Sequence, residues 1–451
     1  MLQKAVFAIS VLFLLLLNAE SARGQLFGPP PLLILGDSLG EGVQSADASW
    51  RTQPFAYGSL VAGQARVPLL LPLIQTSPLG VVGDTSSRRR IFPFLAGANL
   101  AVSGTDVHGL LNDRADGTID SETDLVLSPR RGSQVEIAER LRSPYMICWV
   151  GSNDVLSAVL SFDQLDASQM TPAAQFKSDF SQIAQRLRAT GRRIVFGNVP
   201  DVHRAGFLVD RDDLIRFLGT DLGLPPGFLT SAVAMFAIRL GLVSPVILAD
   251  PNFVLDPAEI LLIEQRVNQF NQIIAEEAAA VGMPVADVKA LYDSISASPP
   301  LYAGVQLSDR FLGGIFSLDG VHPSNIGHAL VANTFIETAN VAYGLGIPLL
   351  SAAQLNQIAF SDPFIDKDGD GRVSGRFLAG LLETLAPILG ISGDANDFVP
   401  QTLTTALTAD AGSRFMQEYQ KLRSNRTSLR SWWTGQEALD ALRDLFDRRR
   451  K

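Results

Sequence analysis

A serine hydroxyl that follows the first strongly apolar run of the chain is its first candidate for chemistry. Residues 32–35 are leucine and isoleucine, Gly36 ends the run, and Asp37 and Ser38 come next. Such a run is typical of a strand buried on both faces, and the glycine permits a sharp turn. Because ligands bind at the carboxyl ends of strands in open α/β sheets, we predict that Ser38 is a nucleophile. Asp37 is expected to be a structural acceptor that ties the turn together.

A serine nucleophile needs a base, and the chain offers four histidines. His322 follows Asp319 by three residues in a loop that ends on a proline, so an imidazole and a carboxylate on one tight turn can reach each other. His108 and His203 each follow another predicted strand and are the competing bases. His328 lies in a predicted helix without a visible partner. The residues alone leave His108, His203 and His322 as candidates.

An oxyanion site needs hydrogen-bond donors, and two loops after predicted strands supply candidates. Gly104 follows the predicted strand at 97–102, and Asn153 follows the one at 145–150. Glycine lets a main-chain N–H approach a substrate without a side chain in the way, and asparagine is a neutral donor that does not titrate. Either residue alone is a weak signal, because both are ordinary turn residues.

Four short blocks occur in the order found in the GDSL family, also called the SGNH hydrolases: GDSL at 36–39, NLAVSG at 99–104, GSND at 151–154 and DGVHP at 319–323. The chain therefore resembles this family. The resemblance implies a catalytic triad of Ser38, His322 and Asp319, and an oxyanion hole made by the Ser38 N–H, Gly104 and Asn153. It also implies that an ester is hydrolysed through an acyl-enzyme and that catalysis requires no cofactor.

The elements that must position these residues alternate along the chain. Predicted strands at 32–35, 97–102, 145–150, 193–198 and 283–288 are separated by helical patterns. This alternation predicts a parallel sheet between two layers of helices. The resemblance implies the three-layer α/β/α, flavodoxin-like form of that fold. We therefore expect an α/β protein whose strand ends gather the candidate residues.

Three regions stand outside this alternation. Residues 204–256 form an insertion with a nearly continuous apolar stretch at 229–248, and we interpret this insertion either as extra core or as a lid or wall for an apolar acyl chain. Residues 66–95, rich in proline, glycine and arginine, are expected to form a long loop near the mouth of the site. The hydrolase domain is predicted to span 25–343, and a smaller, mainly helical C-terminal region to span 344–451.

An acidic segment at 366–377 is similar to an EF-hand calcium loop. The candidate metal ligands stand at its positions one, three, five and seven: Asp366, Asp368, Asp370 and Arg372. Position twelve is Phe377, where a bidentate glutamate would be expected. We therefore predict either a degenerate structural calcium site or a solvated acidic turn.

The first residues are typical of a signal peptide. Lys4 precedes an apolar run at 5–17, and small residues at 22 and 24 suit a cleavage site, so residues 1–24 are predicted to be removed. The alternative is an uncleaved membrane anchor, for which the run is short. Cys148 is the only cysteine, so no disulfide can form within the chain. Export without disulfides favours a periplasmic or secreted bacterial protein.

The formal net charge of −9 provides no basic face for a polyanion and argues against nucleic acid as a partner. Trp432, Trp433 and the basic residues 448–451 are interpreted as a solvated helix end or as a peripheral contact with an anionic membrane. The favoured hypothesis is an exported serine hydrolase for lipid or fatty-acyl esters. The alternatives are a carbohydrate O-acetylesterase and a non-catalytic, calcium-binding surface protein on the same scaffold.

Overall fold

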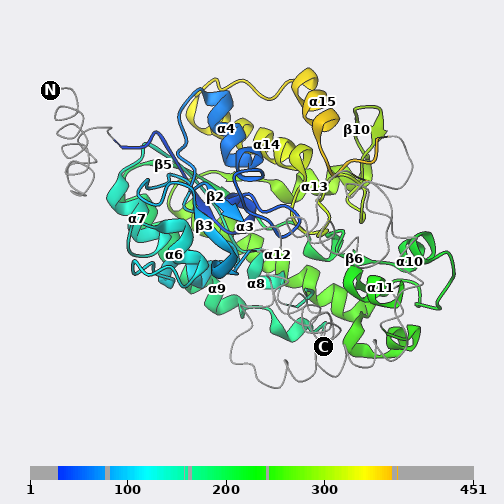
Figure 1. Cartoon of the computed structure of the whole chain (residues 1–451). Coiled ribbons are helices and arrows are strands. Elements are labelled where there is room, and N and C mark those ends of the chain that lie inside the picture. Colours follow the sequence, from blue (N-terminus) through cyan, green and yellow to red (C-terminus); the bar gives the residue numbers. More distant parts are fainter. Residues whose placement is uncertain are drawn as a thin grey trace, which may run out of the picture.

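A parallel sheet with helices against both faces stands at the centre of the molecule (Figure 1). The structure, a computed structural model, describes residues 29–76, 82–156, 158–160, 165–239, 243–367 and 373. The arrangement confirms the α/β class and the three layers predicted from the alternating pattern. The predicted signal peptide at 1–24 and most of the predicted C-terminal region lie outside the described residues.

Four parallel strands form the sheet in the order β1-β4-β5-β9: β1 (Leu32–Gly36), β4 (Tyr145–Trp149), β5 (Arg193–Gly197) and β9 (Val285–Ala286). The segment predicted as a strand at 97–102 lies beside β1 but makes a single parallel bridge, between Ile34 and Asn99. The two segments share the bonds from Ile34 N to Ala98 O, from Leu100 N to Ile34 O and from Val102 N to Gly36 O. A second bridge is missing because the Gly36 N–H donates to the Gln134 side chain instead of to this segment. Because β1 has neighbours on both sides, Ser38 follows an inner strand.

Alternate residues of β1 face two different cores, one on each side of the sheet. Leu33 and Leu35 pack into the first core, whereas Leu32 and Ile34 pack into the second. The helices of the first side are α5 (Val107–Asn112), α6 (Glu122–Leu127), α7 (Gln134–Leu141), α8 (Asn153–Leu156), α9 (Ala173–Ala189) and α12 (Pro257–Ala280). Those of the second side are α4 (Tyr57–Ala65), α13 (Val288–Ala297), α14 (Asn325–Tyr343) and α15 (Ala352–Ser361).

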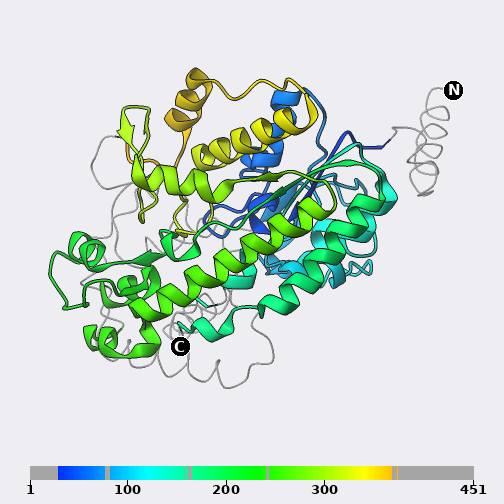
Figure 2. The same ribbon diagram turned by 180° about the vertical axis from the view of Figure 1, so that it is seen from behind.

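The two longest helices of the first side, α9 and α12, pack side by side (Figure 2). Phe176 of α9 stacks on Phe270 of α12 with ring centroids 3.9 Å apart. A capping box of Asp256 and Glu259 starts α12, and Pro257 occupies its first position. These two helices cover part of the first face of the sheet.

The apolar insertion at 204–256 folds into a small unit with a core of its own. Its antiparallel strands and its helices are β6 (Leu208–Val209), β7 (Leu229–Ser231), β8 (Val254–Leu255), α10 (Arg211–Leu218) and α11 (Ala232–Arg239). Its buried side chains pack together with Phe311 from outside the insertion. The insertion thus contributes extra core, which is one of the two interpretations of the sequence, and a lid role stays a prediction.

Residues 66–95, predicted to form a long loop, are mostly irregular in their described part but also contain short strands. Their described part contains the antiparallel pair β2 (Ile74–Thr76) and β3 (Arg88–Arg90). Arg88 and Arg90 are buried, and of the three consecutive arginines only Arg89 is exposed. The two buried guanidinium groups find carboxylate and carbonyl partners inside the protein.

The first residues of the predicted C-terminal region pack on the hydrolase domain. Helix α15 lies against α14 and against a hairpin of β10 (Leu301–Tyr302) and β11 (Val305–Gln306). Leu355 and Ile365 belong to the same core as Ile34 of β1. The domain boundary predicted at residue 343 stays a prediction.

Candidate active site

The nucleophile candidate Ser38 follows a turn that only glycine can make. Gly36 has φ of +152°, and a Cβ added there would lie 2.2 Å from the Trp149 carbonyl oxygen. The buried side chain of Gln134 holds this residue from both sides: its oxygen accepts the Gly36 N–H at 2.9 Å, and its nitrogen donates to the Gly36 carbonyl at 2.8 Å. Ser38 then starts the short helix α3 (Ser38–Glu41).

Asp37 caps that helix, as its predicted structural role requires. One carboxylate oxygen accepts the Leu39 N–H at 3.0 Å. Burial raises the pKa of Asp37 to about 7, although the Leu39 N–H and the charge of nearby His322 act in the opposite direction. Asp37 is therefore a buried cap close to the imidazole.

His322 and Asp319 are in direct contact, which confirms the pairing predicted from their spacing. The imidazole Nδ1 lies 2.7 Å from Asp319 Oδ2, and the His322 side chain is buried. The other Asp319 oxygen accepts the N–H groups of Val321 and His322, both at 2.9 Å. Burial alone would raise the pKa of Asp319, but His322 and these main-chain donors outweigh it and lower the pKa. An ionised carboxylate therefore orients the ring.

The segment after Ser38 is fastened to the loop that carries Asp319 and His322, more than 270 residues away along the chain. The bonds between the two segments run from Ser45 N to Ser317 Oγ at 2.9 Å, from Leu318 N to Ser45 Oγ at 2.9 Å, from Ala46 N to Asp319 Oδ2 at 3.1 Å and from Gln44 Nε2 to Asn325 Oδ1 at 2.9 Å. These buried or partly buried bonds bring the candidate nucleophile and the candidate base to one edge of the sheet.

The other histidines lie in different surroundings. The His108 side chain is 55% exposed and pairs with Asp179, with 3.1 Å between Nδ1 and Oδ2. His203 contacts Glu264, and burial lowers the pKa of its imidazole. His328 is completely buried in α14, where burial and then the charge of His322 lower its pKa to about 3. His328 is therefore a poor candidate for the general base, because that base must accept a proton from the serine and pass it on.

The two candidate oxyanion loops touch each other. Asn153, the first residue of α8, donates from Nδ2 to the Thr105 carbonyl at 2.8 Å, and Thr105 directly follows Gly104. Gly104 has φ of +78°, and a Cβ there would meet no atom within 4 Å. An open space therefore adjoins the Gly104 main chain. The Asn153 amide carries two hydrogens, so one can bond Thr105 while the other serves a ligand.

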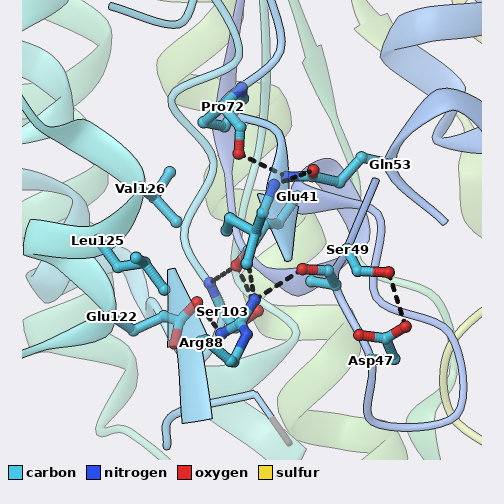
Figure 3. Close-up of polar contacts among 12 residues, drawn as sticks. Glu41, Asp47, Ser49, Gln53, Pro72, Arg88, Ser103, Glu122, Leu125 and Val126 are labelled. Carbon is cyan, nitrogen blue, oxygen red and sulfur yellow. Dashed lines mark hydrogen bonds and ion pairs between the residues drawn. The ribbon is translucent and has the colours of Figure 1, made fainter. Parts of the chain in front are cut away.

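A buried charged cluster joins these loops to the nucleophile helix, and the sequence analysis missed it (Figure 3). Glu41, the last residue of α3, accepts from the Ser103 N–H at 2.8 Å and from the Ser103 hydroxyl at 2.5 Å. Its second oxygen lies 3.2 Å from Arg88, which also contacts Glu122 and donates to the Ala48 carbonyl at 2.8 Å. Ser103 precedes Gly104, so Glu41 links α3 to the candidate oxyanion loop.

The protonation of the Glu41 carboxyl is governed by its burial and by the two charged residues beside it. Burial, and next the neighbouring Glu122 carboxylate, raise the pKa of Glu41 to about 8, whereas Arg88 acts to lower it. One guanidinium shared by two carboxylates cannot neutralise both. No motif marked this arrangement in the sequence, because a run of three arginines is typical of a solvated surface.

Ser38 lines a pocket whose walls are mainly apolar. Large side chains of the wall include Leu39, Trp149, Leu156, Tyr292 and Phe316. Tyr292 and Phe316 stack in parallel with ring centroids 5.6 Å apart. Charged residues also line the pocket, among them Arg204 and Asp293, which form an ion pair at 3.2 Å. Of the described residues of the insertion, Arg204 and Ala205 reach this pocket, and none of the described residues of 66–95 lines it.

The predicted calcium loop lies almost entirely outside the described residues. Asp366 belongs to the described part, whereas Asp368, Asp370 and Arg372 do not. Among the described residues, no group of three or more histidine, cysteine or acidic side chains is placed to hold a metal ion. Within the same part of the chain, no helix has the length and apolarity needed to cross a membrane. The predicted calcium site stays a prediction.

The parallel sheet between two layers of helices, with buried Ser38 and His322 and partly buried Asp319 at one edge, is the α/β/α architecture of the SGNH hydrolases. The chain belongs to the GDSL-like lipase/acylhydrolase family, whose model matches residues 32–335. This match confirms the resemblance carried by the four sequence blocks. Members of the family are ester hydrolases. No curated protein sequence matches the chain.

Several solved structures are similar to this one at low sequence identity. Phospholipase A1 from Streptomyces albidoflavus NA297 is 16% identical, with a TM-score of 0.35 over 69% of this chain and 100% of that one. An extracellular lipase from Streptomyces rimosus is 14% identical, with a TM-score of 0.34 over 69% of this chain and 98% of that one. An acetyl xylan esterase from Geobacillus stearothermophilus is 13% identical, with a TM-score of 0.35 over 71% and 97%.

Proposed function

We propose that the protein is an exported serine hydrolase that cleaves lipid or fatty-acyl esters. The observation that supports it best is the joint placement of three features: the buried His322–Asp319 pair, the fastening of its loop to the segment after Ser38, and the position of Ser38 in an apolar pocket. Export is inferred from the signal-like residues 1–24.

In the proposed reaction, the Ser38 hydroxyl attacks the acyl carbonyl while His322 Nε2 accepts its proton. Asp319 holds Nδ1 of the ring at 2.7 Å, so it fixes the tautomer with Nε2 unprotonated and stabilises the imidazolium that forms. His322 then returns the proton to the departing alcohol, which leaves an acyl group on Ser38. Water, activated by the same imidazole, releases the acid and restores the serine.

The negative charge of the tetrahedral intermediate is proposed to be held by the N–H groups of Ser38 and Gly104 and by the Asn153 amide. The open space beside Gly104 and the contact of Asn153 with Thr105 support this assignment. Losing one such donor typically costs about 2.7–4 kcal/mol of transition-state stabilisation. These donors are held by the fold, so they need little reorganisation during the reaction.

The apolar wall supports an acyl group longer than acetyl. Trp149, Tyr292 and Phe316 present aromatic surface next to Ser38, and apolar surface removed from water contributes about 25 cal/mol per Å². An acetyl group would use little of this wall. A carbohydrate O-acetylesterase would instead be expected to present a small polar pocket beside its nucleophile.

Turnover of a series of p-nitrophenyl esters tests the proposal. We expect kcat/KM to be higher for the octanoate than for the acetate, and Ser38→Ala to abolish turnover while its circular dichroism spectrum matches that of the unaltered chain. Unchanged turnover in Ser38→Ala would remove the assignment of the nucleophile. A preference for acetate would favour the O-acetylesterase.

A further inference from the structure

The segment directly after β3 exposes an unusual amount of apolar surface. Residues 91–95, here called the apolar loop, have the sequence Ile-Phe-Pro-Phe-Leu, and all five are exposed. Phe94 is 73% exposed and Phe92 is 55% exposed. Soluble proteins rarely place four or more apolar residues in a row in water unless the surface has a function. The exposed apolar side chains of this loop therefore indicate a binding surface.

Other exposed apolar side chains belong to segments that are hydrogen-bonded to the same stretch of chain. The Ile91 N–H donates to the Leu73 carbonyl at 2.9 Å, the Trp50 N–H donates to the Ile74 carbonyl at 2.8 Å, and Ala98 N–H donates to the Leu70 carbonyl at 2.6 Å. The side chains of Trp50 and Leu70 are themselves close to half exposed. The apolar loop, Trp50 and Leu70 are called the docking face below.

The apolar loop is held in place by buried arginine. Arg90 donates from Nη1 to the carbonyl oxygens of Ser128 at 2.7 Å and of Val126 at 3.0 Å, and from Nη2 to the Leu95 carbonyl. The guanidinium thus clamps the far end of the loop to the chain near α6. Because the loop is fixed before any partner binds, little conformational entropy is lost when its side chains are buried.

The charge around the docking face is opposite to that of the chain as a whole. Segments 50–76 and 85–98 contain no aspartate or glutamate, in a chain whose formal net charge is −9. Arg51, Arg66 and Arg89 of these segments are exposed. Arg51 lies over the Trp50 ring, with its guanidinium carbon 5.1 Å from the ring centroid. Apolar and cationic groups therefore occur together on these two segments, and the nearest acidic residues along and across the chain include Asp84, which bonds its own turn, and Glu122, which pairs with buried Arg88.

We propose that the docking face binds an anionic lipid surface. Aromatic rings and leucine enter the boundary between headgroups and acyl chains, while arginines contact anionic headgroups at the rim. A protein partner would not require the exclusion of acidic residues from both segments. Binding to a lipid surface is a second function beside the proposed ester hydrolysis, and it does not depend on the role of Ser38.

The docking face is connected to the candidate active site through strand β3. The apolar loop follows β3, and Arg88 at the start of β3 contacts Glu41 of the nucleophile helix. A lipid-bound loop would therefore be connected to α3 by a buried ion pair (Figure 3).

Vesicle co-sedimentation of the full chain carrying Ser38→Ala tests the proposal, because this variant leaves the lipid intact whatever the activity. We expect binding to vesicles of equal parts phosphatidylglycerol and phosphatidylcholine, and weaker binding to phosphatidylcholine alone. The further change Phe92→Ser with Phe94→Ser should lower the affinity about 100-fold, since burial of each ring contributes about tenfold. Arg89→Gln should lower it about fivefold on anionic vesicles only.

Phe360→Ser is the matched control, because Phe360 is 71% exposed on α15, outside the docking face. It should bind as the Ser38→Ala parent does, and circular dichroism checks that all variants are folded. The proposal is overturned if the parent does not bind anionic vesicles, or if the double phenylalanine variant binds as tightly as the parent. A double variant that only turns a dimer into a monomer would show that a second copy of the chain occupies the face instead.

Discussion

Replacement of Glu41 by glutamine should slow ester hydrolysis without touching the proposed triad. The Glu41 carboxylate accepts both the N–H and the hydroxyl of Ser103, next to Gly104, and it pairs with buried Arg88. Glutamine has nearly the same size but carries no charge, and only one of its two terminal atoms accepts hydrogen bonds. Both Ser103 bonds end on Oε2 and Arg88 faces Oε1, so either orientation of the amide turns its NH₂ group toward a donor, Ser103 or Arg88. The anchor of the loop that carries Gly104 is therefore weakened.

The magnitude follows from these contacts. Because the pKa of Glu41 is raised to about 8, the cost of about 3–5 kcal/mol for removing one partner of a buried ion pair applies only above that pH. Near neutral pH the cost in folding stability is that of a poorly satisfied buried hydrogen bond, about 1–3 kcal/mol. A shift of about 1 Å in a positioning group can cost about 100-fold in rate. We therefore expect kcat to fall about 10-fold to 100-fold, which corresponds to about 1.4–2.7 kcal/mol of barrier height.

The assay is the steady-state hydrolysis of a soluble p-nitrophenyl ester, with kcat and KM determined separately. KM should stay within about twofold, because Glu41 does not line the pocket. Glu122→Gln is the matched control: it breaks the other carboxylate contact of Arg88, but Glu122 bonds neither Ser103 nor α3. This control should lower the urea midpoint of unfolding and leave kcat unchanged.

Two results would refute the reasoning. If Glu41→Gln keeps kcat within twofold of the unaltered chain, the link between α3 and the Gly104 loop does not position the oxyanion donors. If Glu122→Gln lowers kcat as strongly as Glu41→Gln does, the loss follows from the stability of the whole cluster rather than from the Ser103 contact.

Further predictions concern the base, the turn and the pH dependence of stability. Asp319→Asn should lower kcat about 10⁴-fold, because an amide favours the wrong tautomer of His322; a loss under tenfold in the same ester assay would contradict the pairing. Gly36→Ala should destabilise the fold by about 2 kcal/mol or more in urea unfolding, because the new methyl group collides with the Trp149 carbonyl. Burial raises the pKa of Asp154 to about 7, above the ordinary value of an aspartate, so the folded chain binds more protons than the unfolded chain until pH passes this value. The thermal midpoint should therefore fall as pH rises from about 6.5 to about 8.5, and Asp154→Asn should flatten this slope; a midpoint that rises over the same range would contradict the assignment.

The sequence predicted the parts of the site that depend on local patterns. The apolar run before Gly36 became β1, and the three-residue spacing of Asp319 and His322 became a contact, because both follow from short-range geometry. The alternation of strands and helices was enough for the fold class. The catalytic roles themselves stay predictions that the experiments above address.

Polar contacts between residues far apart in the sequence could not be predicted from such local patterns. Gln134, which holds Gly36 from both sides, lies 98 residues away and belongs to no motif. Arg88 belongs to a segment that was expected to be a long loop, yet it is buried, and its partners Glu41 and Glu122 lie 47 and 34 residues away along the chain. The expected strand at 97–102 makes only one bridge because Gln134 takes the Gly36 N–H that a second bridge would use, and such competition between a side chain and the ladder depends on tertiary context.

Labelling by a fluorophosphonate probe tests most directly whether the fold builds a reactive serine at the end of β1. We predict that peptide mapping by mass spectrometry finds the phosphonyl group on Ser38, and that the Ser38→Ala and His322→Ala variants are not labelled. A folded, unaltered chain that takes up no label, or that carries it on another residue, would contradict the account.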